Sequence, residues 1–313
     1  MKPLKFTVKV PGTSANLGPG FDIMGLALNV KNEFTFFFDA QDKREVLMHN
    51  QETLPFSLDE DFVFLAFKKY FSLYLPQEKV PNYRLILKLE LPLKGGLGSS
   101  ASALVAGFLA AYTFHKKNHP AISLPSERDM LYHLALMEGH PDNTTPAFIG
   151  GLVFAYFSNG TLEYYKHKFP GTITLFAFTP DQQMCTNASR KALPESYPGK
   201  DVVFNMSRIS AWYEFLASGK PGHLLNALQD KIHTPYRITE DSVLAKVIKS
   251  VKQEIIGYSL SGSGPTLLFY VQRKKAEQAE KNIGAILENL FKERKMQYKF
   301  FRVKADRSGA AVS

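Results

Sequence analysis

The chain has 313 residues, 45% of them hydrophobic and 21% charged, which suits a folded globular protein with room for two domains. No apolar run approaches the roughly 20 residues of a membrane helix. The first ten residues alternate like a strand and do not resemble a signal peptide, so we expect a cytoplasmic protein. The single cysteine, Cys185, excludes an internal disulfide and a cysteine-based zinc site. The net charge of +9 is diffuse, so we expect neither nucleic-acid nor membrane binding.

The first part of the chain mixes predicted strands and helices. Alternating apolar residues predict strands at residues 6–10 and 34–38, separated by a glycine-rich loop at 11–22. Two helical segments and a further strand, at 85–91, should follow. Ser126, with Asp129 three residues later, forms a capping-box-like start for a helix that ends at Gly139. That helix would carry Glu138 at its C-terminal end.

The second part begins with a strand predicted at residues 172–178. Helices are expected at 202–217 and 224–229, and the chain should end in strand, helix and strand. This pattern indicates a second layer of helices and strands. We therefore divide the chain into an N-terminal domain of residues 1–165 and a C-terminal domain of residues 166–313.

The loop at residues 92–100 is the most informative stretch, because it places three glycines and two serines between a strand and an alanine-rich helix. A helix start offers unpaired N–H groups and a partial positive charge, and glycines let the backbone approach an anion. The loop therefore predicts a phosphate site. It lacks the ending of a Walker A loop. Taken alone, it also fits a turn that only joins strand to helix.

Three other clusters are rich in glycine and polar residues: residues 11–22, 138–143 and 259–266. Each also fits a structural role. The third could be a tight connection, and Asp142 or Asn143 could cap the helix that follows. The clusters become informative about function when they are considered together and in order.

In order, the four clusters resemble the motifs of the GHMP small-molecule kinase superfamily and, within it, the homoserine kinase branch. Residues 11–22 are similar to a Pro-x-x-x-Ala-Asn-Leu-Gly-Pro-Gly-Phe-Asp element, residues 92–100 to a Pro-x-x-x-Gly-Leu-Gly-Ser-Ser nucleotide motif, and residues 259–266 to a third motif. The stretches 138–143, 186–190, 193–194 and 229–237 also resemble the homoserine branch. The resemblance covers essentially the whole chain.

The resemblance implies an α+β fold with an N-terminal domain like domain 2 of ribosomal protein S5 and a ferredoxin-like C-terminal domain. The active site would lie between them. Asp61 would begin the segment that flanks the adenine of ATP, where the family often has asparagine. Ser100 and Glu138 would bind Mg²⁺, which prefers oxygen ligands. The rest of the ATP site would consist of Pro92, Lys94, Gly95, Gly96, Leu97, Gly98, Ser99 and Ser100.

By the same resemblance, the acceptor is L-homoserine, a zwitterion with a free hydroxyl. Asp22 would bind its ammonium group, while Arg190 and Arg237 would bind its carboxylate with the bidentate geometry that suits arginine. Both arginines would also fit solvated ion pairs at the surface, as most arginines do. The remaining pocket residues would be Asn16, His140, Asn143 and Thr186.

Two accounts of the proton transfer stay open. In one, Asn143 orients the hydroxyl and the phosphate oxygens take its proton, because phosphoryl transfer places little demand on early deprotonation. In the other, Asp142 is the base. Both give ATP-dependent phosphorylation of homoserine to O-phospho-L-homoserine, on the branch leading to threonine. The alternatives are a kinase of another alcohol such as mevalonate, or a non-catalytic sensor. A homodimer is common in the family.

Overall fold

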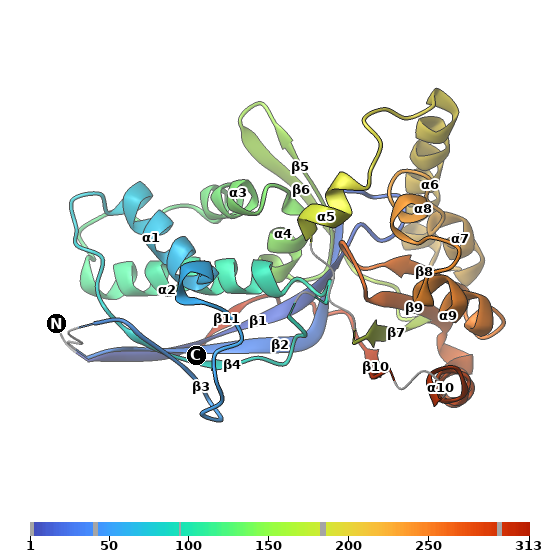
Figure 1. The fold of residues 1–313 in the computed structure, drawn as a ribbon. Helices are drawn as coiled ribbons and strands as arrows, with labels where there is room; N and C mark the ends of the chain where they lie inside the picture. The colour runs from blue at the N-terminus through green and yellow to red at the C-terminus, as the bar shows by residue number, and fades with distance from the viewer. Residues whose placement is uncertain (1–2, 40–42, 94, 182–185, 293–295) are drawn as a thin grey trace.

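A computed structural model describes residues 3–39, 43–93, 95–181, 186–292 and 296–313. Two sheets organise these residues (Figure 1), and the mixture of strands and helices is the predicted α+β class. Over the described residues, no helix is long and apolar enough to cross a membrane.

The first sheet has seven strands, with the central order β11-β1-β2-β4-β3 and a hairpin of β5 and β6 attached to β2. β3 pairs parallel with β4, whereas the other neighbouring pairs are antiparallel. The strands are β1 (Leu4–Ala15), β2 (Met24–Phe38), β3 (Glu45–Met48), β4 (Arg84–Lys88), β5 (Leu152–Ser158), β6 (Thr161–His167) and β11 (Ala311–Val312).

Helices of the first part cover one face of this sheet (Figure 1). Alternate residues of β1 and β2, including Phe6, Phe36 and Phe38, point toward them, and the three rings stack 5.6 to 6.3 Å apart. Period-two burial is therefore the signal that located these strands. The helices are η1 (Leu58–Glu60), α1 (Phe62–Tyr74), α2 (Ser99–Asn118), α3 (Glu127–Glu138) and α4 (Pro141–Ile149).

The predicted cap of α3 is present. The Ser126 hydroxyl accepts a hydrogen bond from the backbone N–H of Asp129 at 3.1 Å, and Gly139 ends the helix with φ +89°. The two helical segments expected before residue 92 correspond to η1 and α1. The strand β3, which follows β2 and precedes η1 along the chain, was not predicted.

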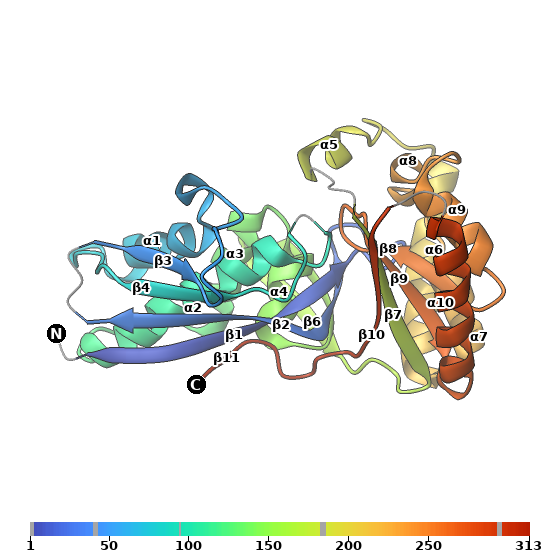
Figure 2. The same cartoon turned by 60° about the horizontal axis from the view of Figure 1, so that its bottom comes forward.

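The second sheet has four antiparallel strands in the order β10-β7-β9-β8 (Figure 2). They are β7 (Ile173–Pro180), β8 (Gly257–Leu260), β9 (Leu267–Gln272) and β10 (Tyr298–Val303). The accompanying helices are α5 (Thr186–Lys191), α6 (Gly199–Ser218), α7 (Pro221–Ala227), α8 (Thr234–Arg237), α9 (Val243–Val251), η2 (Arg273–Lys275) and α10 (Ala276–Lys292).

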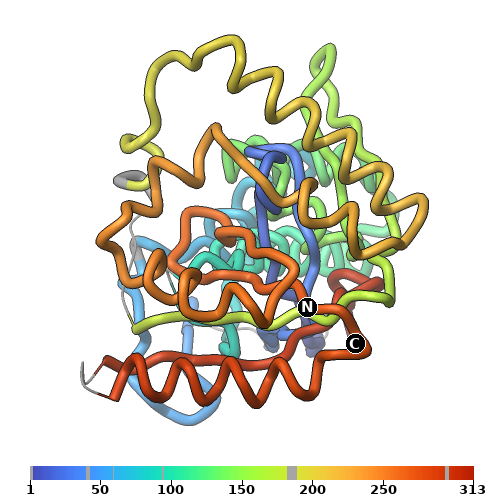
Figure 3. Tube along the Cα trace, turned by 90° about the vertical axis from the view of Figure 1, so that its right-hand side faces the viewer, coloured from blue at the N-terminus to red at the C-terminus, as the bar shows by residue number. Residues whose placement is uncertain are grey.

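Strand β7 shows how this sheet is packed between two cores. Phe176 and Phe178 join the core with α9 and α10, whereas Leu175 and Ala177 join the core with α6, α7 and residues of the first sheet. Viewed from this end, the yellow α6 and the red α10 run along opposite edges (Figure 3). The second core therefore fixes the two sheets relative to each other.

The end of the chain returns to the first sheet. Asp306 donates its backbone N–H to Ala27 at 2.8 Å and forms an ion pair with Lys31 at 2.6 Å, and β11 then pairs with β1. The division proposed between residues 165 and 166 falls within β6. The second domain we propose therefore adds its last residues to the sheet of the first.

Candidate functional site

A cavity of about 900 Å³ lies where the predicted motifs converge. Its walls come from β2 and the loop that precedes it, from the starts of α1, α2 and α4, from the end of α3, and from α5, α8 and the loop between β8 and β9. The sequence-predicted site residues that line it are Asn16, Asp22, Asp61, Gly95, Gly96, Gly98, Ser99, Ser100, Glu138, His140, Asp142, Asn143, Arg190 and Arg237.

The glycine loop is anchored by the loop between β8 and β9, in the second part of the molecule. Thr266 donates its backbone N–H to the Gly95 carbonyl at 3.3 Å, and the Ser261 hydroxyl donates to the Gly96 carbonyl at 2.6 Å. Gly96 has φ +80°, and a Cβ there would lie 2.5 Å from the Ser261 carbonyl oxygen. Only glycine fits such a conformation and approach without strain. The carbonyls are used for anchoring, while the loop backbone borders the cavity.

Among the described residues, no side chain caps the N-terminus of α2. Ser126, Ser242 and Asp61 cap α3, α9 and α1 through their side chains, but no such hydrogen bond forms at Gly98, the N-cap of α2. Gly98 itself is left-handed, with φ +69°. The first N–H groups of α2 are therefore left for a ligand, and the helix dipole favours an anion there.

The predicted metal ligands meet at one edge of the cavity. Ser100 donates its hydroxyl to Glu138 Oε2 at 3.2 Å, linking the start of α2 to the end of α3. Burial raises the pKa of Glu138, and Asp142 adds to the rise, whereas His140 and Ser100 oppose it. A divalent cation would offset both unfavourable effects. The two oxygens are also the type of donor that Mg²⁺ prefers, so the residues fit this ion.

The loop between β1 and β2 is held in an uncommon backbone conformation. Asn16, Leu17 and Asp22 all have positive φ values, of 71°, 46° and 59°. The Asn16 side chain stabilises the loop, because it accepts from the Asp22 N–H at 3.1 Å and donates to the Gly262 carbonyl at 3.0 Å. Backbone strain that tertiary contacts maintain is characteristic of functional loops. Here it directs Asp22 toward the cavity.

Asp22 faces the two predicted arginines. Arg190 donates two hydrogen bonds to its carboxylate, at 2.8 and 2.9 Å. Arg237 lies behind this pair and donates to the carbonyls of Gly262, at 3.1 Å, and Ser189, at 3.3 Å. The Phe21 ring lies 5.3 and 5.2 Å from the two guanidinium groups. Burial and the charge of Arg190 lower the pKa of Arg237.

His140 and Asp142 form a partly buried ion pair at the start of α4. The His140 Nδ1 bonds to Asp142 Oδ1. Burial alone would lower the pKa of His140, but Asp142, followed by Glu138 and Asp22, outweighs burial and raises it to about 9. His140 is therefore a cation at neutral pH, with Asp142 as its counter-ion.

Asn143, one residue further along α4, has a fixed amide. Thr13 Oγ1 donates to Asn143 Oδ1 at 2.7 Å. Since this bond occupies the oxygen, the Asn143 amide nitrogen is available to donate to an oxygen in the cavity. The close approach of Gly25 to α4 sets this geometry, because a Cβ at Gly25 would lie 1.7 Å from the Asp142 carbonyl oxygen.

Asp61 borders the cavity, but its side chain already has two partners. It caps α1 by accepting from the Phe64 N–H at 3.0 Å, and it forms an ion pair with Arg44. The Asp61 carboxylate therefore has a structural role already, besides the role at the adenine that we predict for it.

Two predicted residues, Pro92 and Leu97, stand apart from the cavity walls. Leu97 is buried in the core between the two sheets, and the Pro92 ring packs against Gly95. Lys94 lies outside the described residues, as does the side chain of Thr186 at the start of α5.

Several residues at the site were not predicted. Thr13 and Phe21 lie within the first cluster, and Ser261 and Thr266 lie within the third, so the motifs contained them without indicating their contacts. Their position between motif residues was the one feature of the sequence that could have identified them as site residues. Their partners are distant in sequence and could not be read from spacing.

Residues 62–151 match the model of the GHMP kinases N terminal domain, and the fold is that of a GHMP kinase. The chain is similar to the homoserine kinase of Caldicellulosiruptor bescii, with 35% identity over 98% of this chain and 96% of the relative. It therefore belongs to the homoserine kinase family.

Solved structures support the same fold. The homoserine kinase of Cytophaga hutchinsonii matches with a TM-score of 0.80 and 23% identity, over 99% of this chain and 97% of that one. The mevalonate kinase of Methanococcus jannaschii matches with a TM-score of 0.67 and 14% identity, over 96% and 98%. Kinases of different substrates therefore share the fold, and substrate choice has to be argued from the site.

Proposed function

We propose that the protein transfers the γ-phosphoryl group of ATP to the side-chain hydroxyl of L-homoserine, giving O-phospho-L-homoserine and ADP on the branch leading to threonine. The observation that carries this proposal is the arrangement of one cavity. It has an uncapped, glycine-lined helix start on one side and Asp22, Arg190 and Arg237 on the other. The first suits a polyphosphate and the second an amino-acid zwitterion.

For the nucleotide, we propose that Gly95, Gly96, Gly98, Ser99 and Ser100 surround the phosphates, with Ser100 and Glu138 as Mg²⁺ ligands. The ion would neutralise charge that develops on the transferred group. Pro92 and Leu97 would support the loop, and Lys94 stays a prediction. Asp61 would fix the start of α1 beside the adenine.

For the acceptor, we propose that Asp22 binds the ammonium group, and Arg190 and Arg237 bind the carboxylate. Asn16 would hold Asp22 in place. His140, Asn143 and Thr186 would complete the pocket. In this arrangement the free amide nitrogen of Asn143 donates to the acceptor hydroxyl oxygen and orients it for attack.

The protonation states favour one account of the proton. The Asp142 carboxylate already accepts a hydrogen bond from His140, whose raised pKa keeps the ring protonated. We therefore propose that the hydroxyl proton passes directly to a phosphate oxygen as the new O–P bond forms and the bond to the ADP oxygen breaks. Asp142 then acts by holding His140.

The alternatives are less well supported. Mevalonate has no ammonium group for Asp22 to bind, and a sensor without catalysis would not need the Ser100 and Glu138 pair. Because ATP and amino acids are metabolites of the cell interior, we also propose a cytoplasmic location. A homodimer, which is common in the family, stays a prediction.

The test is an assay of ADP release with L-homoserine, mevalonate and simple sugars as acceptors, with phosphorus NMR of the product. Turnover with homoserine and a phosphomonoester resonance on its hydroxyl are expected. Absence of turnover with homoserine, in the presence of ATP and Mg²⁺, would refute the proposal. Turnover with mevalonate instead would support the other kinase.

A further inference from the structure

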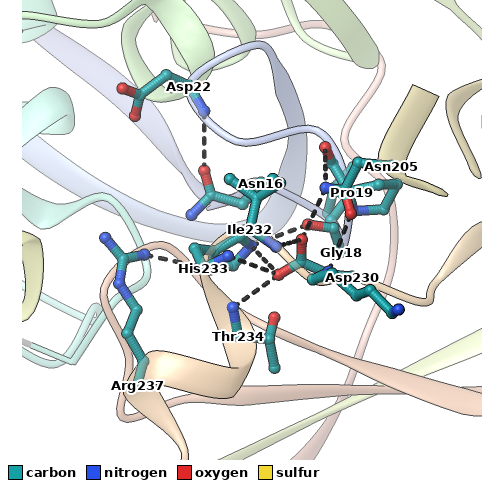
Figure 4. Close-up of polar contacts among 12 residues, drawn as sticks. Asn16, Gly18, Pro19, Asp22, Asn205, Asp230, Ile232, His233, Thr234 and Arg237 are labelled. Atoms are coloured by element: carbon teal, nitrogen blue, oxygen red, sulfur yellow. Dashed lines mark hydrogen bonds and ion pairs between the residues drawn. The ribbon is translucent and has the colours of Figure 1, made fainter. Parts of the chain in front are cut away.

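A second group of polar residues lies behind the cavity and has no part in the function proposed above. It is centred on His233, which lies at the N-cap of α8, and on Asp230 in the preceding turn (Figure 4). The His233 side chain is completely buried, and that of Asp230 is 1% exposed. Buried polar side chains need complete hydrogen bonding, so their partners are informative.

Asp230 organises the turn before α8. Its carboxylate accepts from the backbone N–H groups of Ile232 at 2.8 Å, His233 at 3.1 Å and Thr234 at 2.6 Å. It also accepts from the Asn205 amide at 2.8 Å, and Asn205 donates to the Pro19 carbonyl at 3.2 Å. These contacts fix the backbone on which the His233 ring stands.

The two ring nitrogens of His233 have different partners. Nε2 lies 2.8 Å from the Gly18 carbonyl, which can only accept, so Nε2 carries the proton. Nδ1 lies 3.3 Å from Arg237 Nη1, which can only donate, so Nδ1 is the acceptor. Both contacts require the same neutral tautomer. Burial, the largest influence, lowers the pKa of His233, which favours this neutral form.

His233 thereby joins the two elements that form the acceptor pocket. Gly18 belongs to the strained loop that carries Asn16 and Asp22, while Arg237 is the more buried of the two arginines. The His233 ring also stacks on Phe21, 5.4 Å between centroids, and Phe21 contacts both guanidinium groups. His233 therefore contacts Phe21, the Gly18 backbone and Arg237.

We propose that His233 is a positioning residue for the acceptor: it sets the distance between the loop of Asp22 and the guanidinium of Arg237, with Asp230 holding its ring in place. This rests on the proposed function, in which these two groups bind opposite ends of homoserine. Without His233, Arg237 would keep its charge and its bonds to the Ser189 and Gly262 carbonyls but lose the contact that joins it to the Asp22 loop, so homoserine affinity should fall while nucleotide affinity is retained.

Two substitutions separate the contacts of the ring. In His233→Gln the amide nitrogen stands near Nε2 and keeps the donor to Gly18, but the acceptor for Arg237 is lost. In His233→Asn the amide oxygen stands near Nδ1 and keeps that acceptor, but the donor to Gly18 is lost. We expect His233→Gln to raise KM for homoserine about tenfold, with KM for ATP changed less than about twofold.

A double-mutant cycle with Arg237→Ala shows whether the residue acts through the arginine. If it does, His233→Gln adds almost nothing to KM for homoserine in the Arg237→Ala background, whereas His233→Asn still raises it through the loop. Additive effects of His233→Gln and Arg237→Ala would overturn the proposal. So would equal increases in KM for homoserine and ATP.

The matched control is His115→Gln. His115 is also completely buried and accepts or donates one hydrogen bond with Tyr70 at 2.8 Å. It lies on α2 about 22 Å from Ser100 along the helix axis. The His115→Gln substitution should lower thermal stability without changing KM for homoserine. If the control raises KM for homoserine as much as His233→Gln does, a general loss of stability explains both and the proposal fails.

Variants that lose stability are compared by calorimetric titration of homoserine below their melting temperature, which does not depend on turnover. Weaker homoserine binding by His233→Gln alone supports the proposal, and unchanged binding refutes it. If the unsubstituted protein does not phosphorylate homoserine but still binds it, the proposed function fails while the positioning role is still decided by the titration.

Discussion

Asp22 and Arg190, 168 residues apart in the chain, bind each other through two parallel hydrogen bonds of 2.8 and 2.9 Å. They come from the first strand connection and from α5, so the contact joins the two parts of the molecule. In the proposed complex each would bind an opposite charge of homoserine. The zwitterion would therefore exchange one ion pair within the protein for two between protein and ligand.

Arg190→Ala should raise KM for homoserine about tenfold or more, because a charged bidentate partner is lost, while KM for ATP changes little. Steady-state kinetics with each substrate varied in turn measures this. Arg302→Ala is the matched control, since Arg302 on β10 forms a half-exposed ion pair with Glu280 on α10, and its loss should leave both constants unchanged. Equal increases in both KM values after Arg190→Ala would assign that arginine to the nucleotide.

Glu138→Gln should reduce kcat at least about a hundredfold, because the neutral amide no longer offsets the charge of a divalent cation. Ser100→Ala should cost less, since the hydroxyl is a neutral ligand. The measurement is kcat as a function of Mg²⁺ concentration. In Glu138→Gln the Mg²⁺ needed for half-maximal activity should rise, and an unchanged Mg²⁺ dependence would exclude Glu138 as a ligand.

Thr13→Val should lower kcat about tenfold, because it frees the Asn143 amide that the Thr13 hydroxyl fixes at 2.7 Å. Thr7→Val, on the same strand, removes a hydroxyl that bonds to Thr35 at 2.9 Å away from the cavity. That control should keep the unsubstituted kcat while losing similar stability. If the two variants have the same kcat, the fixed amide does not contribute to turnover.

The parts of this structure that could be predicted are those that local patterns determine. Ser126 and Asp129 cap α3 because both belong to one turn, and alternating apolar residues specify β1 and β2. The short strand β3 has too few residues for a clear period. Contacts such as Thr13 with Asn143 or His233 with Gly18 depend on how whole elements pack, and no local spacing encodes them.

The same limit applies to the charges of the site. The motifs indicated that Ser100 and Glu138, or Asp22 and the arginines, belong together, and these side chains do meet around one cavity. The sequence could not indicate that Asp61 is paired with Arg44, or that Asp142 is paired with His140. Those pairs arise from burial, which makes an unpaired charge costly.

Asp142→Asn decides between the two accounts of the proton. If the carboxylate only holds His140, the variant should retain turnover, with kcat reduced less than about tenfold, since the amide oxygen can still accept from the ring. The measurements are single-turnover phosphorylation and homoserine binding by calorimetry. Loss of turnover with unchanged homoserine binding would show that Asp142 is the base and that direct transfer is the wrong account.

His140 also predicts a pH dependence of stability. Folding raises its pKa from 6.5 to about 9, so the folded protein holds this proton more tightly than the unfolded chain does. The stabilisation is complete below pH 6.5 and is lost as the pH rises through 9. The His140→Gln variant has no group that binds this proton, so it lacks the stabilisation at every pH. The difference in unfolding free energy between the unsubstituted protein and this variant should therefore shrink by roughly 2–3 kcal/mol between about pH 6 and pH 9.5 in urea titrations. Glu138 acts against this change, because its pKa rises further in the variant without the His140 cation, and the variant then also loses stability with rising pH until Glu138 ionises. A difference that stays constant over this range would mean that His140 is not held as a cation by Asp142.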